Sequence, residues 1–160
     1  MTERPAARPG QPGADLRWLR EAIELSRRCP PSASAFSVGA VLVSAAGTVI
    51  ATGYSREREP KDHAEEVALA QAAGDPLLTG ATLYSSLEPC LARASRPRSC
   101  VELITEAGVG RVVIAWLEPP LFVEGGGGGA LRRAGVDVVE VPWLAELARS
   151  ANAHLLGENG

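Results

Sequence analysis

The chain has 160 residues, a net charge of −3 and 46% hydrophobic residues, which fits one globular domain and excludes a wholly disordered protein. The acidic balance argues against binding of nucleic acid through broad phosphate neutralisation and favours a small-molecule ligand. No window approaches the roughly 18 continuous apolar residues of a membrane helix, so we expect a cytoplasmic protein.

The first half of the chain predicts a tail, a helix and a hairpin. Residues 1–13 carry no apolar run, so they predict a flexible tail rather than a signal peptide. Apolar residues at helical spacing predict an amphipathic helix over 14–29, which two prolines end. The β-branched runs 37–44 and 48–54 predict a hairpin, and their apolar character predicts burial on both faces.

The rest of the chain predicts strands alternating with helices. The expected helices cover 63–74, 99–108, a short helix ending over 130–135, and 143–156, and the expected strands cover 81–87, 111–117 and 136–141. This alternation predicts parallel crossovers, and therefore an α/β fold with a five-stranded mixed sheet covered on both faces. We expect a single domain over 14–157, with the glycine tract 125–129 as a loop.

Candidate metal ligands lie near two expected helix starts. His63 and Glu65 open the second helix, where both side chains can point past the helix end, and Asp62 is expected to cap it. Cys90 follows the third strand, and Cys100 lies beside the next helix start. One nitrogen and two sulfurs are a donor set that zinc prefers, and three protein ligands leave a position open for water. Glu65 would remain free to carry protons.

The cysteines have other possible roles. The chain contains three, and an odd number in a reducing compartment makes a disulfide the least favoured interpretation. A structural zinc site normally has four protein ligands, and the sequence offers no good fourth. A domain that has lost catalysis is a further alternative, against which the intact Glu65 argues. Cys29 is expected to be a thiol at the end of the first helix.

The spacing of these residues resembles a known enzyme pattern. H-x-E followed by P-C-x-x-C is typical of zinc deaminases, and HAE at 63–65 and PC at 89–90 match it. Nine residues separate the two cysteines here instead of two. With this longer loop, the chain resembles the deaminase domain of the bifunctional riboflavin-biosynthesis deaminase/reductase, within the cytidine/deoxycytidylate deaminase superfamily. The resemblance includes VGAVLV, ATLYSSLEPC and ITEAGVGRVVIAW.

This resemblance implies a three-layer α/β/α cytidine-deaminase-like fold and one zinc ion per chain. It implies hydrolytic removal of an exocyclic amine from an aminopyrimidine, with a diaminohydroxyphosphoribosylaminopyrimidine-type substrate of the riboflavin pathway as the first candidate. Glu65 would be the general acid and base. It also implies a homodimer or homotetramer, and a separate reductase in the pathway, because no reductase sequence follows.

Departures from the family pattern leave the substrate open. Ala35 stands where the family carries an asparagine, and Glu118 and Pro120 replace an aspartate and an asparagine. The alternative is a deaminase of another nucleobase or nucleoside, cytidine-like or from specialised metabolism, and FSVGA is similar to a cytidine deaminase motif. The arginines between the cysteines either grip a substrate phosphate or form a solvated face. The candidate substrate contacts are Phe36, Ser37, Ala64, Ser86, Arg96, Arg98 and Glu118.

Overall fold

A single mixed sheet forms the centre of the molecule. The computed structural model describes residues 7–11, 13–91, 98–117 and 126–157. The sheet has the strand order β2-β1-β3-β4-β5. The strands are β1 (Gly39–Val43), β2 (Val49–Tyr54), β3 (Thr82–Leu87), β4 (Arg111–Trp116) and β5 (Asp137–Glu140). β1 is antiparallel to β2 and to β3, whereas β3, β4 and β5 are parallel, so the predicted five-stranded mixed sheet is confirmed.

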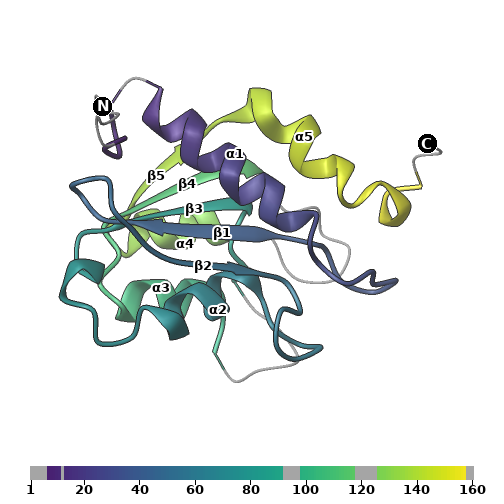
Figure 1. Ribbon diagram of the computed structural model, residues 1–160, viewed down its shortest axis with the longest axis horizontal. Coiled ribbons are helices and arrows are strands. Elements are labelled where there is room, and N and C mark those ends of the chain that lie inside the picture. The colour runs from purple at the N-terminus through teal and green to yellow at the C-terminus, as the bar shows by residue number, and fades with distance from the viewer. Residues whose placement is uncertain (1–6, 12, 92–97, 118–125, 158–160) are drawn as a thin grey trace, which may run out of the picture.

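Helices cover both faces of this sheet. α1 and α5 lie over one face, and α2, α3 and α4 lie over the other (Figure 1), which confirms the three-layer arrangement. The helices are α1 (Ala14–Ser26), α2 (Ala64–Gln71), α3 (Cys100–Glu106), α4 (Gly127–Arg133) and α5 (Ala145–Ser150), with short 3-10 turns η1 (Pro76–Leu78), η2 (Pro142–Leu144) and η3 (Ala153–Leu155). Within the described residues, no helix has both the length and the apolar character that crossing a bilayer requires.

Two sequence predictions about burial and helix length were wrong. β1 is buried along its length, but β2 is an edge strand and exposes 42% of Val49, because it has a neighbouring strand on one side only. The predicted closing helix over 143–156 is broken into η2, α5 and η3. The break precedes Asn152, whose side-chain amide bonds the backbone N–H and C=O of Ser37. A contact with a distant part of the chain therefore interrupts the helix.

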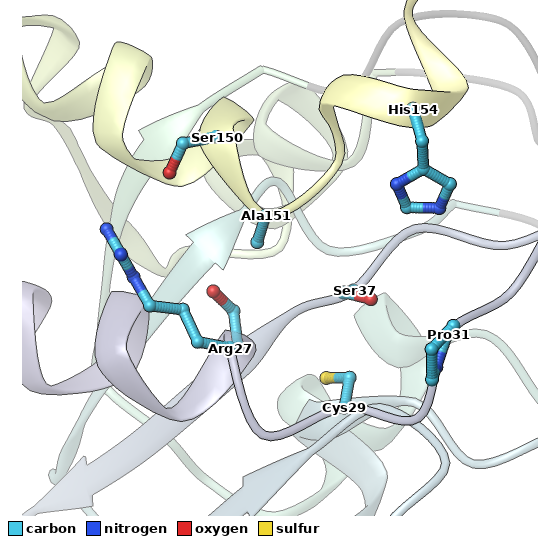
Figure 2. Close-up of a pocket in the computed structure, with 8 residues that line it drawn as sticks. Arg27, Cys29, Pro31, Ser37, Ser150, Ala151 and His154 are labelled. Atoms are coloured by element: carbon cyan, nitrogen blue, oxygen red, sulfur yellow. The ribbon is translucent and has the colours of Figure 1, made fainter. Parts of the chain in front are cut away.

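A pocket lies between the end of α1 and the C-terminal segment. It has a volume of about 530 Å³ and is lined in part by Cys29, Ser37, Ser150 and His154 (Figure 2). One ring nitrogen of His154 is 2.9 Å from the carbonyl oxygen of Ser32. The residues before β1 are thus held against the end of the chain.

The central strand β3 presents alternate side chains to the two helical layers. Tyr84 points toward α1, where its hydroxyl donates to Asp15 Oδ1 at 2.6 Å. Arg111 of β4 donates to the same carboxylate, with Nη1 2.8 Å from Oδ1. Burial alone would raise the pKa of Asp15, but the hydrogen bonds from Arg111 and Tyr84 outweigh it and lower that pKa. This cluster fixes α1 on the sheet and leaves Ser85 facing the opposite layer.

Residues 127–129 of the glycine tract form the start of α4, so their prediction as a loop was wrong, whereas Gly125 lies outside the described residues. A Cβ atom on Gly127 would lie 1.8 Å from the carbonyl oxygen of Pro89, so only glycine lets the helix approach this backbone. The amide of Gly128 donates to Oε2 of the buried Glu88 at 2.8 Å. The first turn of α4 therefore packs directly against the backbone that leads to Cys90.

Replacing Asp15 with alanine should lower the free energy of unfolding by about 2 kcal/mol, because it leaves Arg111 and Tyr84 without their shared acceptor. Since the folded-state pKa of Asp15 lies below its ordinary value of 3.8, its stabilisation is complete above that pH and is lost as the pH falls through the folded pKa. Urea unfolding at pH 7 and at pH 3 should show a smaller difference between wild type and variant at pH 3. Asp137→Ala is the control, since Asp137 also pairs with Arg111 but is 69% exposed, and an equal loss there would contradict the prediction.

Replacing Gly127 with alanine should lower the free energy of unfolding by about 1–3 kcal/mol, because the new Cβ overlaps the Pro89 carbonyl. Gly129→Ala is the matched control within the same helix. A Cβ there meets only the flexible side chain of Arg133 at 3.4 Å, so this change should be neutral or stabilising by up to about 1 kcal/mol. Urea unfolding of the two variants checks the prediction, which equal effects would refute.

Candidate active site

His63 stands at the N-cap of α2 in an extended conformation, as the sequence predicted for a residue at the helix start. Its backbone N–H donates to the Glu66 carboxylate at 2.9 Å, which fixes the first turn. Asp62 was expected to cap this helix, and that prediction was wrong. The Asp62 carboxylate instead accepts the amides of Arg58 and Glu59 in the preceding turn, so it shapes the approach to His63.

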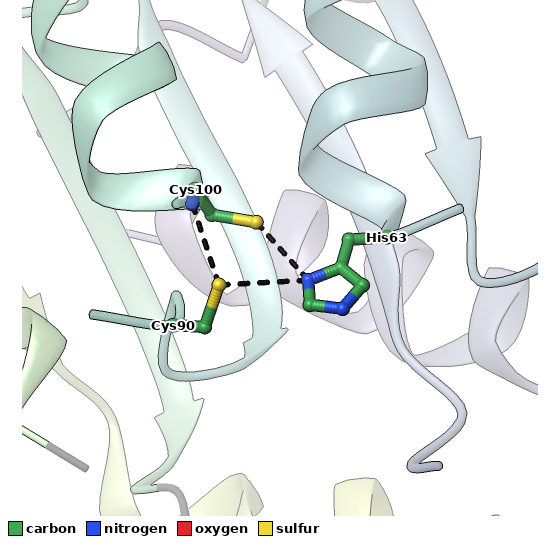
Figure 3. A group of neighbouring side chains, drawn as sticks. All are labelled: His63, Cys90 and Cys100. Atoms are coloured by element: carbon green, nitrogen blue, oxygen red, sulfur yellow. Dashed lines mark hydrogen bonds between the residues drawn. The ribbon is translucent and has the colours of Figure 1, made fainter. Parts of the chain in front are cut away.

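Two sulfur atoms lie beside the His63 ring. Cys90 follows β3, and Cys100 is the first residue of α3. Nδ1 of His63 is 3.3 Å from the Cys100 sulfur and 3.6 Å from the Cys90 sulfur (Figure 3). A tetrahedral zinc with ordinary Zn–N and Zn–S bonds would separate such ligands by about 3.6 Å. The donor set and its spacing therefore fit zinc, as the sequence predicted.

The two cysteines are free thiols rather than a disulfide. The backbone N–H of Cys100 donates to the Cys90 sulfur at 3.3 Å. Hydrogen bonds from Cys100 and His63 lower the pKa of Cys90 and favour its thiolate, the form that binds metal. This hydrogen bond comes from the N-terminus of α3, where a negative charge on the Cys90 sulfur is favoured.

Glu65 lies in the first turn of α2 and is only 4% exposed. Its Oε1 accepts a hydrogen bond from the Ser85 hydroxyl at 2.9 Å. Burial raises the pKa of Glu65, although the charge of His63 and a hydrogen bond from Cys100 act in the other direction. A buried carboxylate with a raised pKa beside a metal cluster is suited to accepting and releasing a proton.

Sequence reasoning missed Ser85 and selected its neighbour Ser86. The Ser86 hydroxyl accepts the backbone N–H of Gly39 at 3.0 Å and joins β3 to the start of β1. Consecutive side chains of a strand point to opposite faces, so only one of the two serines can face Glu65. The sequence offered no signal for which face α2 would cover.

The other candidate substrate contacts lie in different surroundings. Phe36 is buried and makes an edge-to-face contact with Trp116 at the end of β4, with ring centroids 5.3 Å apart. The Ser37 hydroxyl accepts a hydrogen bond from Arg56 at 2.8 Å. Ala64 is fully buried at the start of α2.

One of the two arginine candidates lies in the described part of the structure. Arg98 is exposed and pairs with Glu106 at the end of α3, with Nη2 2.6 Å from Oε1. Arg96 and Glu118 lie outside the described residues. Of the histidines, cysteines and acidic residues that are described, His63, Cys90 and Cys100 form the cluster suited to a metal, and Cys29 lies outside it.

Comparison with known proteins finds relatives among the proteins of riboflavin biosynthesis. The chain is 41% identical over 126 residues to a diaminohydroxyphosphoribosylamino-pyrimidine deaminase from Schizosaccharomyces pombe. It is 41% identical over 116 residues to the riboflavin biosynthesis protein RibD from Aquifex aeolicus. These matches cover 77% and 72% of this chain but 31% of each relative, so the chain spans about a third of their length.

Solved structures share the fold. A RibD structure from Acinetobacter baumannii superposes with a TM-score of 0.74 at 34% identity, covering 90% of this chain and 40% of that one. A Rib2 deaminase from Aspergillus oryzae, studied as a C-terminal deletion mutant, superposes with a TM-score of 0.72 at 25% identity. This second match covers 91% of this chain and 92% of the other, so the three-layer fold is common to both.

A family match covers the metal cluster itself. Residues 13–116 match the family described as the cytidine and deoxycytidylate deaminase zinc-binding region. The matched span includes His63, Glu65, Cys90 and Cys100, and the first, third and fourth of these are positioned to bind one zinc ion. The chain therefore belongs to the zinc-binding cytidine and deoxycytidylate deaminase family.

Proposed function

We propose that this protein is a zinc-dependent hydrolytic deaminase that removes an exocyclic amine from an aminopyrimidine. The observation that carries the proposal is a buried carboxylate, Glu65, beside a cluster of three metal-binding side chains. Three protein ligands leave a position for water, which a closed structural site lacks. This arrangement favours catalysis over the alternative of a structural zinc module.

The reaction exchanges the amine for a carbonyl oxygen with water as the second reactant. Zinc, when bound by His63, Cys90 and Cys100, supplies a Lewis acid that lowers the pKa of water to about 7. Glu65 takes a proton from the attacking water, delivers it to a ring nitrogen and passes a further proton to the departing ammonia. Its raised pKa favours proton uptake, and the Ser85 hydroxyl holds Oε1 in one position.

The preferred substrate is a diaminohydroxyphosphoribosylaminopyrimidine of the riboflavin pathway. The 41% identity to the fission yeast deaminase supports this choice. Ala35, in place of the asparagine expected from the riboflavin enzymes, supports a second candidate, a cytidine-like nucleobase or nucleoside. The proposed substrate contacts among the described residues are Phe36, Ser37, Ala64, Ser86 and Arg98.

Assembly and location stay predictions. The sequence and its resemblance predict a homodimer or homotetramer, a cytoplasmic location and a single domain over 14–157. Light scattering of the purified protein would test the first of these.

The zinc-loaded protein should release ammonia from the riboflavin-pathway aminopyrimidine faster than from cytidine, deoxycytidine, deoxycytidylate or guanine. A coupled ammonia assay over this panel measures the preference. Removing zinc with a chelator should abolish the activity, and added zinc should restore it. Release from cytidine alone would move the proposal to the second candidate, and no release from any compound would refute the deaminase.

Replacing Glu65 with glutamine should lower kcat by about 10²–10⁴-fold, because the amide cannot carry a proton. The zinc content should stay at one ion per chain, since Glu65 lies outside the three-residue metal cluster. Glu21→Gln makes the same chemical change on an exposed position of α1 and should leave kcat unchanged. Wild-type kcat in the Glu65→Gln protein would exclude Glu65 as the proton carrier.

A further inference from the structure

We propose that Arg56 is a positioning residue that holds segment 30–37 against the turn leading to His63, and thereby sets the KM for the substrate. The proposal rests on the proposed function, because segment 30–37 contains Phe36 and Ser37, two of the proposed substrate contacts.

The guanidinium of Arg56 spans this segment. Nε and Nη2 donate to the carbonyl oxygen of Pro30 at 3.1 and 2.7 Å. Nη1 donates to the carbonyl of Phe36 at 3.1 Å, and Nη2 donates to the Ser37 hydroxyl at 2.8 Å. One planar group thus joins the two ends of the segment, with four contacts that a lysine ammonium has no geometry to reproduce.

The backbone of Arg56 is hydrogen-bonded to the residue that precedes the metal-binding His63. Its N–H donates to the carbonyl of Asp62 at 2.9 Å, and Asp62 directly precedes His63. Among the described residues, Arg56 is the one non-glycine with a positive φ, at 59°. An arginine in the left-handed region costs free energy relative to glycine, so its side chain offsets that cost through the contacts it makes.

Segment 30–37 lies at the same end of the central strands β3 and β4 as the metal cluster. Phe36 packs on Trp116 at the end of β4, and the amide of Gly39, just after the segment, bonds Ser86 near the end of β3. Cys90 follows that end of β3. The segment therefore lies beside the end of β3, from which the chain leads to the metal ligand Cys90.

The opposite side of the segment is held by the C-terminal residues. Asn152 bonds the backbone of Ser37, and His154, which lines the pocket of Figure 2, contacts the carbonyl of Ser32. The structure thus restrains the segment from two sides, and Arg56 provides the restraint that is continuous with the chain leading to His63. Losing it would free the substrate contacts while leaving the C-terminal restraint and the metal ligands in place.

Two substitutions separate this role from a general role in folding. Arg56→Ala removes the guanidinium and keeps the unfavourable φ, whereas Arg56→Gly removes the guanidinium and also relieves the backbone. We expect the glycine variant to be the more stable, and both variants to raise KM by about tenfold with kcat little changed, as loss of uniform binding predicts. Zinc content should remain at one ion per chain. Arg58→Ala, at an exposed arginine in the same turn, should leave KM unchanged.

Hydrogen exchange gives a measurement that does not depend on activity. Amides in 34–36 should exchange faster in both Arg56 variants than in the wild type, while the Ser37 amide, which Asn152 still accepts, and those of α2 keep their protection. Faster exchange without a rise in KM, or a fall in kcat at constant KM, would overturn the proposal, and so would unchanged exchange. A wild-type protein inactive on every substrate would overturn the proposed function, and exchange would then still decide whether Arg56 holds the segment.

Discussion

The alternation of side chains along β3 is the constraint on which the rest of the structure depends. β3 is buried along its whole length between two helical layers. Tyr84 points to one layer and bonds Asp15 of α1, whereas Ser85 points to the other and bonds Glu65 of α2. A shift of one residue would exchange these faces and separate Glu65 from its partner. The same strand then leads into Glu88 and Cys90, so its register places both the hydrogen-bond partner of Glu65 and a metal ligand.

The metal cluster and the neighbouring Glu65 bring together groups that are unfavourable side by side without a cation. Cys90, Cys100 and Glu65 are all buried, and each becomes negatively charged when it loses its proton. A hydrogen bond with Cys90, burial and the charge of Glu65 raise the pKa of Cys100, and burial together with the charge of Cys90 raises the pKa of Glu65. A divalent ion compensates buried thiolates, because it supplies positive charge where water is excluded. The protein therefore combines a donor set suited to zinc with surroundings that make zinc favourable.

Two backbone features lie next to this cluster. Glycines at the start of α4 let that helix contact the carbonyl of Pro89, so the chain before Cys90 is supported from outside the site. Arg56 adopts a left-handed conformation and fastens the segment before β1 to the turn before His63. Both features act on the backbone near a metal-binding residue, so they restrain the surroundings of a site whose residues come from distant parts of the chain.

The sequence by itself determined the chemistry and the class of fold. Strand and helix periods predicted the mixed α/β sheet, and the residue types and spacing of HAE and the two cysteines predicted a zinc cluster, because ligand chemistry depends on which atoms are present. Tertiary structure decided the features that depend on packing between distant segments. The face of β3 that meets α2 placed Ser85, and not Ser86, beside Glu65. The approach of α4 to Pro89 made residues 127–129 helical instead of a loop. Asn152 broke the closing helix for the same reason, since its partner Ser37 lies 115 residues away, beyond the reach of any local pattern.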